Sequence, residues 1–485
     1  MVDELGPVDD RLLAEELGAT LTQAQDALPA AAPGAVATIR RRYRRQRRWR
    51  AGLASVTVAA LVVLASLTGA ELTRGRSVPP VPPAGERGTA VLRVWAVKPP
   101  DADSALQQLV DRYNRGAEVD VELTTFGNEE YKEQLRTAVG SADGPDVFAS
   151  WGGANLTRLS RDGLLADLTP LRDEPGVGDR FVPAVLAGGA VDGRQYGMPM
   201  SGTHPVVLFY HRDVFARAGV EPPRNYADLL SLVQTFKAKK ITPIALGGAQ
   251  GWTELMWVMY LAERIGGPTI SADIVAGRPG AWSQPAVLRA LRDAQELVER
   301  GAFGTDFASV GYDDGDASGR LASGQAAMQL MGTWEYPAQV ARNSEFVAGG
   351  KLGFVPFPAV EGGAGDPADL VGIPTNFFSV AAGSRHREAA LDFVRAATAD
   401  AHLDALVAEG AVPPVIDAAQ RLRGTEHAAF TTAVHELVVR APSQDLAWDQ
   451  AVEPEVAAAL TTNLRRLFRG QLSPEQFATV MTEAS

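Results

Sequence analysis

The sequence predicts an α/β protein whose folded body follows a single membrane-spanning segment. Three observations lead to this fold class: strand-like and helix-like segments alternate after residue 89, an uncharged stretch precedes them, and the composition is that of a folded protein. Of the 485 residues, 46% are hydrophobic and 21% are charged, which is enough apolar material for two or three globular units. The absence of cysteine excludes disulfides, thiolate catalysis and the acceptor for a lipid anchor.

Residues 1–50 form a predicted cytoplasmic segment. Apolar residues recur at spacings of three or four from Leu13 to Leu28, which predicts a short amphipathic helix. Eight arginines follow between Arg40 and Arg50, and attraction to anionic lipid explains them more simply than nucleic acid does. The net charge of −12 also argues against nucleic acid as the main partner, because phosphate binding needs a basic surface.

Residues 51–70, AGLASVTVAALVVLASLTGA, carry no charge. At a rise of about 1.5 Å per residue they reach roughly 30 Å, the thickness of the hydrocarbon layer. The arginines before them stay inside by the positive-inside rule, so the C-terminal body is predicted to lie outside the cytoplasm. The small residues Thr68 to Ala70 leave open a cleaved signal peptide, but fifty preceding residues are long for a signal, so we favour an uncleaved anchor. The Pro-rich residues 71–89 read as an extended linker.

The body from residue 90 onward begins with three strand-like segments separated by helical ones. This order predicts a mainly parallel sheet covered by helices. Residues 388–485 are predominantly helical in pattern. The predicted strands are 90–96, 118–126, 146–151, 205–210 and 241–246, and the predicted helices between them include 104–113, 129–139 and 226–239.

Glycine, proline and asparagine mark several boundaries in this body. Gly219 ends a helix, the prolines at 222 and 223 prevent its resumption, and Asn225 caps the next helix. Gly332 lets the backbone approach a ligand or another strand closely. Gly197-Met198-Pro199 interrupts regular structure, as a crossing between two domains would.

No catalytic or metal-binding constellation stands out. The six histidines are scattered without an HExxH spacing, and the chain has neither a Walker-type loop nor a GxSxG motif. Adjacent acids such as Asp313 and Asp314 lie in a Gly-rich loop, where solvated side chains are the usual outcome. We therefore expect neither an enzyme nor a bound cofactor or metal.

The body resembles the family 1 extracellular solute-binding proteins of carbohydrate ABC transporters, a group that is similar to the maltose-binding protein. The resemblance rests on a series of motifs in family order rather than on any one of them. In this sequence they are AVLRVWA, YKEQLRTAVGSADGPDVFASW, DGLLADLTPL, YGMPM, LFYHRDVFARAGVEPPRNYADL, ITPIALGG, ASGQAAMQLMGTWEY and LFRGQLSPEQFATVM.

The resemblance implies a two-lobed periplasmic-binding-protein type 2 fold with a ligand cleft between the lobes. Lobe 1 would comprise residues 90–202 and 357–412, and lobe 2 residues 203–356 and 413–485. The protein would capture a di- or oligosaccharide and deliver it to ABC transporter permease subunits, and we expect a monomer. A membrane-bound sugar sensor that signals through residues 1–50 is the alternative, because a transmembrane segment stands where other members carry a lipid anchor.

Sugars present hydroxyls at their edges and apolar C–H faces, so their sites combine aromatic rings with polar side chains. By resemblance, the aromatic platform falls on Trp252, Trp334 and Trp448, with Trp151 on the opposing lobe. The other body tryptophans, Trp95, Trp257 and Trp282, fit structural roles better.

Polar candidates for hydroxyl recognition follow the first two strands and the last tryptophan. They match loops that contact sugar in the family. These residues are Lys98, Asn128, Glu129 and Asp449.

Overall fold

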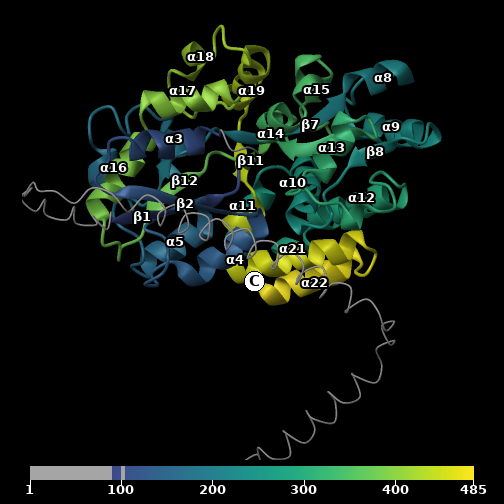
Figure 1. Cartoon of the computed structure of the whole chain (residues 1–485). Coiled ribbons are helices and arrows are strands. Elements are labelled where there is room, and N and C mark those ends of the chain that lie inside the picture. Colours follow the sequence, from purple (N-terminus) through teal and green to yellow (C-terminus); the bar gives the residue numbers. More distant parts are fainter. Residues whose placement is uncertain (1–89, 100–103) are drawn as a thin grey trace, which may run out of the picture. The chain divides into compact units, whose positions relative to one another are not determined.

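Two β-sheets form the centres of two lobes in the computed structural model, which describes residues 90–99 and 104–485 (Figure 1). The predicted helix in residues 1–50, the predicted membrane span 51–70 and the linker 71–89 lie outside the described residues. In the first lobe the strand order is β2 (Asp120–Phe126), β1 (Val91–Val97), β3 (Val147–Ser150), β12 (Phe377–Val380) and β6 (Met198–Pro199).

The second sheet is built around a long buried strand, β7 (His204–His211). Its order is β13 (Gln444–Leu446), β11 (Leu370–Ile373), β7, β9 (Ala326–Gly332) and β8 (Thr242–Ala245), with β10 (Leu352–Val355) also paired to β7. A short hairpin joins β4 (Ala190–Val191) and β5 (Arg194–Gln195) in the first lobe.

The predicted parallel arrangement holds for only part of the two sheets. Strands β1, β2 and β3 are parallel, as the alternating pattern of the first segments predicted. Strand β7 instead runs antiparallel to β9, β10 and β11, and β12 runs antiparallel to β3 and β6. The prediction of mainly parallel sheets was therefore wrong for the second lobe, because the partners of β7 are distant in sequence and leave no local pattern.

Helices cover both sheets. Those of the first lobe are α3 (Ala105–Asn114), α4 (Asn128–Ala138), α5 (Gly153–Arg161), α6 (Thr169–Arg172), α7 (Pro183–Ala187), α16 (Arg387–Ala397), α17 (Asp400–Ala408) and α18 (Ala418–Arg421). Those of the second lobe are α8 (Arg212–Ala218), α9 (Tyr226–Ala238), α10 (Gly251–Gly266), α11 (Thr269–Val275), α12 (Pro285–Glu299), α13 (Asp316–Ala322), α14 (Glu335–Arg342), α15 (Ser344–Ala348), α19 (Ala428–Arg440), α20 (Trp448–Ala451), α21 (Pro454–Phe468) and α22 (Pro474–Ala484), with short 3₁₀ turns at Ala281–Ser283 and Phe307–Ser309.

Local sequence signals explain where several helices begin and end. Gly219 ends α8 in the left-handed conformation, with φ of 70°. Asn225 caps α9 by accepting a hydrogen bond of 2.8 Å from the backbone N–H of Asp228. Both boundaries agree with the sequence prediction, because each depends on residues only a few positions apart.

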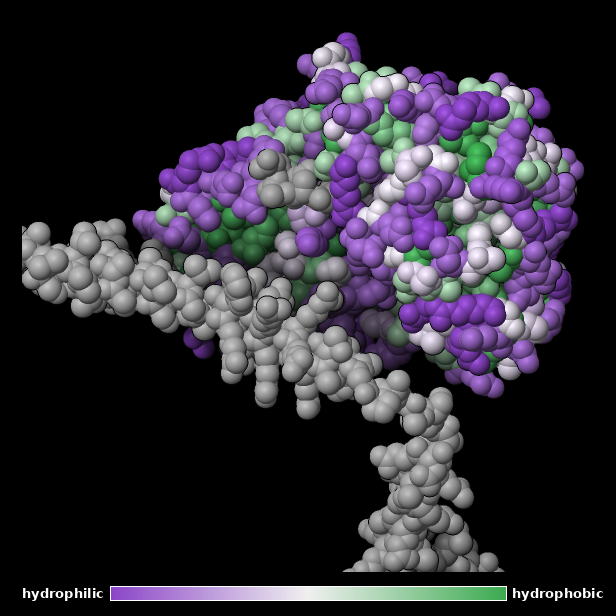
Figure 2. All heavy atoms as spheres, turned by 45° about the vertical axis from the view of Figure 1, so that its right-hand side comes forward, coloured by the Kyte–Doolittle hydropathy of each residue, from purple (hydrophilic) through white to green (hydrophobic). Residues whose placement is uncertain are grey.

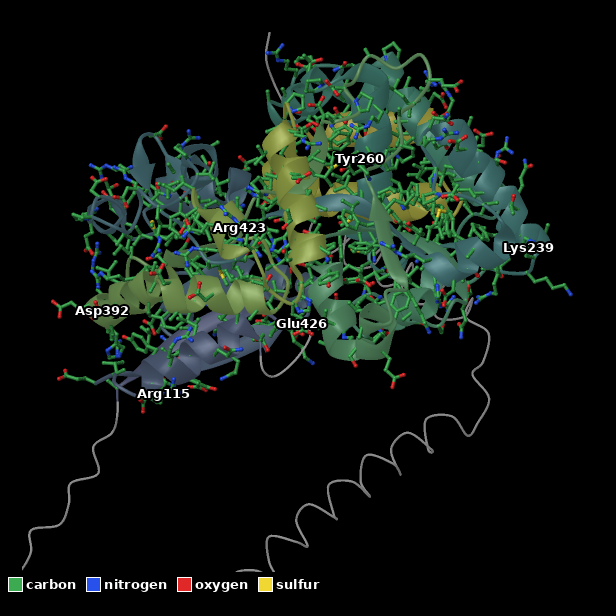
Figure 3. All side chains as sticks on the ribbon, turned by 90° about the horizontal axis from the view of Figure 1, so that it is seen from above. Arg115, Lys239, Tyr260, Asp392, Arg423 and Glu426 are labelled. Atoms are coloured by element: carbon green, nitrogen blue, oxygen red, sulfur yellow. The ribbon has the colours of Figure 1, made fainter. Side chains whose placement is uncertain are left out.

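Each lobe has its own hydrophobic core. Phe148 and Phe378 are completely buried in the first core, and Phe209, Trp257 and Tyr260 are completely buried in the second. Figure 3 places Tyr260 inside the second lobe, where its hydroxyl donates a 2.6 Å hydrogen bond to the carbonyl of Val206. The structural role expected for Trp257 agrees with this burial.

Many charged residues lie at the outer surface. Arg115, Lys239 and Asp392 are exposed and point outward at the periphery of the two lobes (Figure 3). Polar side chains cover much of the face shown in Figure 2, and apolar residues reach it in separate patches.

The chain crosses between the lobes near residues 200–203, 374–376 and 411–422. The backbone N–H of Met200 donates to the carbonyl of Asn376, which ties the first two crossings together. The sequence placed the return to lobe 1 at residue 357, which is too early. Phe357 is buried in the second core and β11 pairs with β7, so the return follows Ile373.

Candidate ligand-binding site

A cavity of about 300 Å³ lies between the two sheets. The first lobe contributes residues that follow its parallel strands: Lys98 after β1, Asn128 after β2 and Trp151 after β3. Ligands of open α/β sheets bind at such carboxyl ends of strands. The volume lies at the lower end of the roughly 300–1,000 Å³ that small-molecule sites occupy.

Aromatic rings from the second lobe form one wall of this cavity. Trp334 lies 6.2 Å from Trp252 between ring centroids, and Trp252 meets Tyr312 edge to face at 5.3 Å. The ring of His204 lies edge to face with Trp334 at 5.7 Å. These four side chains line the cavity, and we call them the aromatic wall.

Backbone geometry holds the aromatic wall in place. Trp334 lies two residues after the end of β9 and immediately before α14. Its indole lies against Gly332, where an added Cβ would approach the ring to 2.1 Å. The sequence predicted a ligand or another strand close to Gly332, whereas the group that lies closest to this glycine is the Trp334 indole. The backbone N–H of Tyr312 donates to the side chain of Gln250, just before α10, at 3.0 Å.

Trp151 faces the cavity from the first lobe. Its ring meets Tyr131 edge to face at 5.6 Å, and the Lys132 ammonium lies 5.9 Å from the ring centroid. Tyr131 is itself fixed by donating a 2.6 Å hydrogen bond to the carbonyl of Ala149. Aromatic rings therefore line the cavity from both lobes.

Apolar side chains line much of the remaining cavity surface. Leu255, Met256 and Met259 come from α10, and Val206 and Val371 come from β7 and β11. Polar groups among the lining residues include Asp313, Arg342, Asn376 and Gln450. This mixture of aromatic rings, apolar surface and a few polar groups is typical of a site for a neutral or weakly charged organic ligand.

Direct contacts join the lobes beside the cavity. The Lys132 ammonium lies 2.8 Å from Asp449 Oδ2, and the backbone N–H of Asn128 donates to Asp313 Oδ2 at 3.3 Å. Arg158 and Glu455 form a further ion pair at 3.1 Å. The lobes are therefore in contact across the cavity in this conformation.

Burial changes the protonation of several groups near the cavity. It lowers the pKa of His204 to about 4, so this imidazole is neutral at pH 7. Burial raises the pKa of Asp313, and the Asn128 N–H partly offsets the effect. Burial opposes the charge on Lys132, but Asp449 and Glu129 outweigh it and raise the pKa of the ammonium.

The structure brings six of the eight predicted site residues to the cavity. They come from both lobes and from segments far apart in the sequence. They are Lys98, Asn128, Trp151, Trp252, Trp334 and Asp449.

Trp448 and Glu129 do not line the cavity. Trp448 is completely buried in the second core, where its indole N–H donates to Ser271 Oγ at 3.0 Å and its ring meets Trp282 edge to face. It therefore serves packing rather than as a platform, and Trp282 has the structural role expected of it. Glu129 is exposed and bonds Lys132 at 3.2 Å, outside the cavity lining.

Sequence reasoning missed several lining residues. Asp313 was expected to be solvated, yet it contacts the opposite lobe at Asn128. Tyr312 beside it and Arg342 in α14 carried no motif signal, and His204 was one of six scattered histidines. The aromatic character of Tyr312, adjacent to the acidic pair, was the one available hint.

The described residues contain neither a cluster of metal ligands nor a membrane-spanning helix. No group of three or more His, Asp or Glu side chains in residues 90–99 and 104–485 is arranged to hold a metal ion. Within the same ranges no helix combines the length and apolar character that crossing a membrane requires.

Comparisons with known proteins point to one family. The profile of bacterial extracellular solute-binding proteins matches residues 97–402. An ABC transporter extracellular-binding protein of Pyrococcus horikoshii is 24% identical over 249 residues, which are 50% of this chain and 54% of that protein. The diacetylchitobiose binding protein of Streptomyces coelicolor is 24% identical over 344 residues, covering 68% of this chain and 75% of that protein.

Solved structures show the same fold. A chitin oligosaccharide binding protein superposes with a TM-score of 0.73 at 24% identity, covering 81% of this chain and 98% of that one. The match therefore includes both lobes, whereas the match to the Pyrococcus protein spans about half of that relative's length.

Proposed function

The chain belongs to the family of bacterial extracellular solute-binding proteins, and we propose that it captures a di- or oligosaccharide between its two lobes and delivers it to an ABC importer. The observation that carries the proposal is the cavity between the lobes with aromatic rings on both sides. Such rings bury the C–H faces of sugars, and the neighbouring polar groups can bind hydroxyls.

Two features support a ligand longer than one sugar ring. Trp151 lies on one lobe, while Trp252, Trp334 and Tyr312 lie on the other, so several stacking surfaces are available. The similar proteins named above are described as binding diacetylchitobiose and chitin oligosaccharides. Chitin-derived sugars are therefore the first ligands to test.

The proposal places the body outside the cytoplasm, in keeping with the family to which the chain belongs. The membrane span at residues 51–70, the permease partners and a monomeric state are parts of the same proposal. No observation on the described residues favours the alternative of a membrane-bound sensor. The proposed role is binding without catalysis.

A panel of sugars tests this function on the purified full-length chain. We expect at least one of N,N′-diacetylchitobiose, chitotriose and the xylo-, malto- and galacto-oligosaccharides to raise the melting temperature. A ligand that binds only the native state at 100 times its Kd stabilises it by about 2.7 kcal/mol. Trp334→Ala should remove the shift and Trp282→Phe, which changes a core residue outside the cavity, should keep it.

The absence of any shift across the whole panel would overturn the sugar proposal. Release of reducing sugar by the purified chain would instead indicate an enzyme.

A further inference from the structure

A buried carboxylic acid lies behind the aromatic wall. Glu335 is the first residue of α14 and is completely buried. Its carboxylate accepts hydrogen bonds from the hydroxyl of Ser318 at 3.0 Å and from the amide of Gln339 at 2.6 Å. The hydroxyl of Tyr312 is its third partner. Buried acids with three donors form well-defined networks, because each unmade bond would be costly.

The same hydroxyl also connects to the tryptophan of the wall. The hydroxyl of Tyr312 also interacts with the side chain of Trp334, whose indole N–H can only donate. The order of donation therefore runs from Trp334 to Tyr312 and from Tyr312 to Glu335. Tyr312 and Trp334 line the cavity, whereas Glu335 does not.

We propose that Glu335 is a positioning residue, which holds the rings of Tyr312 and Trp334 in the orientation that receives the ligand. The identity of that ligand as a sugar rests on the proposed function above. Ser318 comes from α13 and Gln339 from α14, so the acid also fixes the aromatic wall to the two helices behind it. The three donors match an ionised carboxylate, which accepts hydrogen bonds and donates none.

Protonation of Glu335 would disturb this arrangement. A protonated carboxyl group donates one hydrogen bond itself and so competes with its three donors. Burial raises the pKa of Glu335 to about 7, which brings the change into an accessible range. The other charged or titratable groups that face it are Arg342 and Tyr312, and burial raises the pKa of Tyr312 well above its usual value. Near the wall, His204 has a pKa of about 4 and stays neutral in the same range.

Ligand affinity should therefore depend on pH through this one acid. If only the ionised form holds the wall correctly, the apparent Kd at pH 6 is about tenfold weaker than at pH 8. The probe is N,N′-diacetylchitobiose, or the panel sugar with the lowest Kd, measured by calorimetry on the full-length chain. In Glu335→Gln the Kd should change less than about twofold over this range.

Two further variants separate positioning from a general effect on the fold. Tyr312→Phe keeps the ring and removes the hydroxyl, so it should also abolish the pH dependence. Glu254→Gln is the matched control, because Glu254 is another fully buried acid of the second lobe, with a pKa of about 8, and it does not line the cavity. This control should keep the wild-type profile.

A measurement without ligand separates this inference from the proposed function. Every member of the network belongs to the second lobe, so we expect the tryptophan fluorescence of the ligand-free protein to change with a midpoint near pH 7. Glu335→Gln and Tyr312→Phe should lack this transition. If both variants keep the wild-type pH dependence of the fluorescence and of the Kd, the positioning role is overturned. If no sugar binds at all, the proposed function fails, and the fluorescence titration still decides the role of Glu335.

Discussion

The contact between Gly332 and the indole of Trp334 shows how one residue without a side chain can shape a binding surface. The ring occupies the space that a Cβ would need, at 2.1 Å from the ideal Cβ position. A methyl group at this position must therefore displace the ring, because real Cβ atoms do not approach other atoms so closely.

Gly332→Ala should consequently weaken sugar binding by about tenfold, or ~1.4 kcal/mol, while the protein remains folded. The loss follows from the shifted stacking surface rather than from any lost polar contact. Calorimetric titration with a panel sugar measures it. Gly319→Ala in α13 is the control, because a Cβ there meets nothing within 4 Å. An unchanged Kd in Gly332→Ala would show that Trp334 does not stack on the ligand.

Neighbouring residues on α20 illustrate a second effect at the residue scale. Trp448 turns into the core and bonds Ser271, whereas Asp449, the next residue along, lines the cavity and binds Lys132. A change of one position along a helix rotates the side chain by about 100°, because one turn contains 3.6 residues. The family resemblance indicated the correct segment but could not decide which of the two side chains faces the ligand.

At the scale of elements, α4 and α20 are joined by a single well-placed ion pair. Lys132 and Asp449 are 24% and 6% exposed, so the pair is largely removed from water. Removal of one partner would leave a buried charge without compensation, which is strongly destabilising. Since α4 belongs to the first lobe and α20 to the second, removal of one partner destabilises the conformation in which the lobes are in contact.

Lys132→Met should therefore weaken sugar binding by at least tenfold, with the larger part of the effect in the dissociation rate. Arg136→Met is the matched control, because it removes the same charge one turn further along α4. Arg136 and its partner Glu133 are 51% and 66% exposed, and such surface pairs contribute little. Stopped-flow fluorescence measures both rates. Equal effects in the two variants would mean that the charge of α4 acts at long range rather than through Asp449.

The whole molecule contains buried acids whose ionisation opposes folding. Glu254 is completely buried, and neither of its oxygens has a hydrogen-bond partner among the described residues. Burial raises the pKa of Glu254 to about 8, and that of Glu335 to about 7. In the unfolded chain both acids ionise near their ordinary values, so the folded state holds these protons more tightly.

The free energy of unfolding should therefore decrease as the pH rises from 6.5 to 8.5. The folded state binds more protons than the unfolded state until the pH passes the folded pKa, and the loss is on the order of 2 kcal/mol for these two groups. The histidines with lowered pKa values, such as His204, act in the opposite direction, because near pH 6.5 they are partly protonated only in the unfolded chain, but each offsets less than about 0.5 kcal/mol. Urea unfolding at the two pH values measures the effect. Glu254→Gln should reduce it without abolishing it, because burial also raises the pKa of Glu263 to about 8. Constant stability across this range would contradict the assignment.

The sequence determined the α/β class and most local boundaries of the body, and its resemblance to the solute-binding family implied the two lobes. Helix caps such as Asn225, stop signals such as Gly219 and the first three parallel strands depend on residues close together in the chain. The ordered motifs also indicated the segments that meet at the cavity, including those of Trp252 and Trp334. The helix boundaries and the first strands are local features, so one chain is enough to recognise them, whereas the segments at the cavity were indicated by the resemblance to a known family.

Only the tertiary structure decided how distant segments combine. The antiparallel pairing of β7, the return to the first lobe after Ile373 and the contact of Asp313 with Asn128 each join residues far apart in sequence. The role of Glu335 likewise appears only when Tyr312 and Ser318 lie against it. Such pairings depend on packing between elements, and local propensity and spacing carry no information about them.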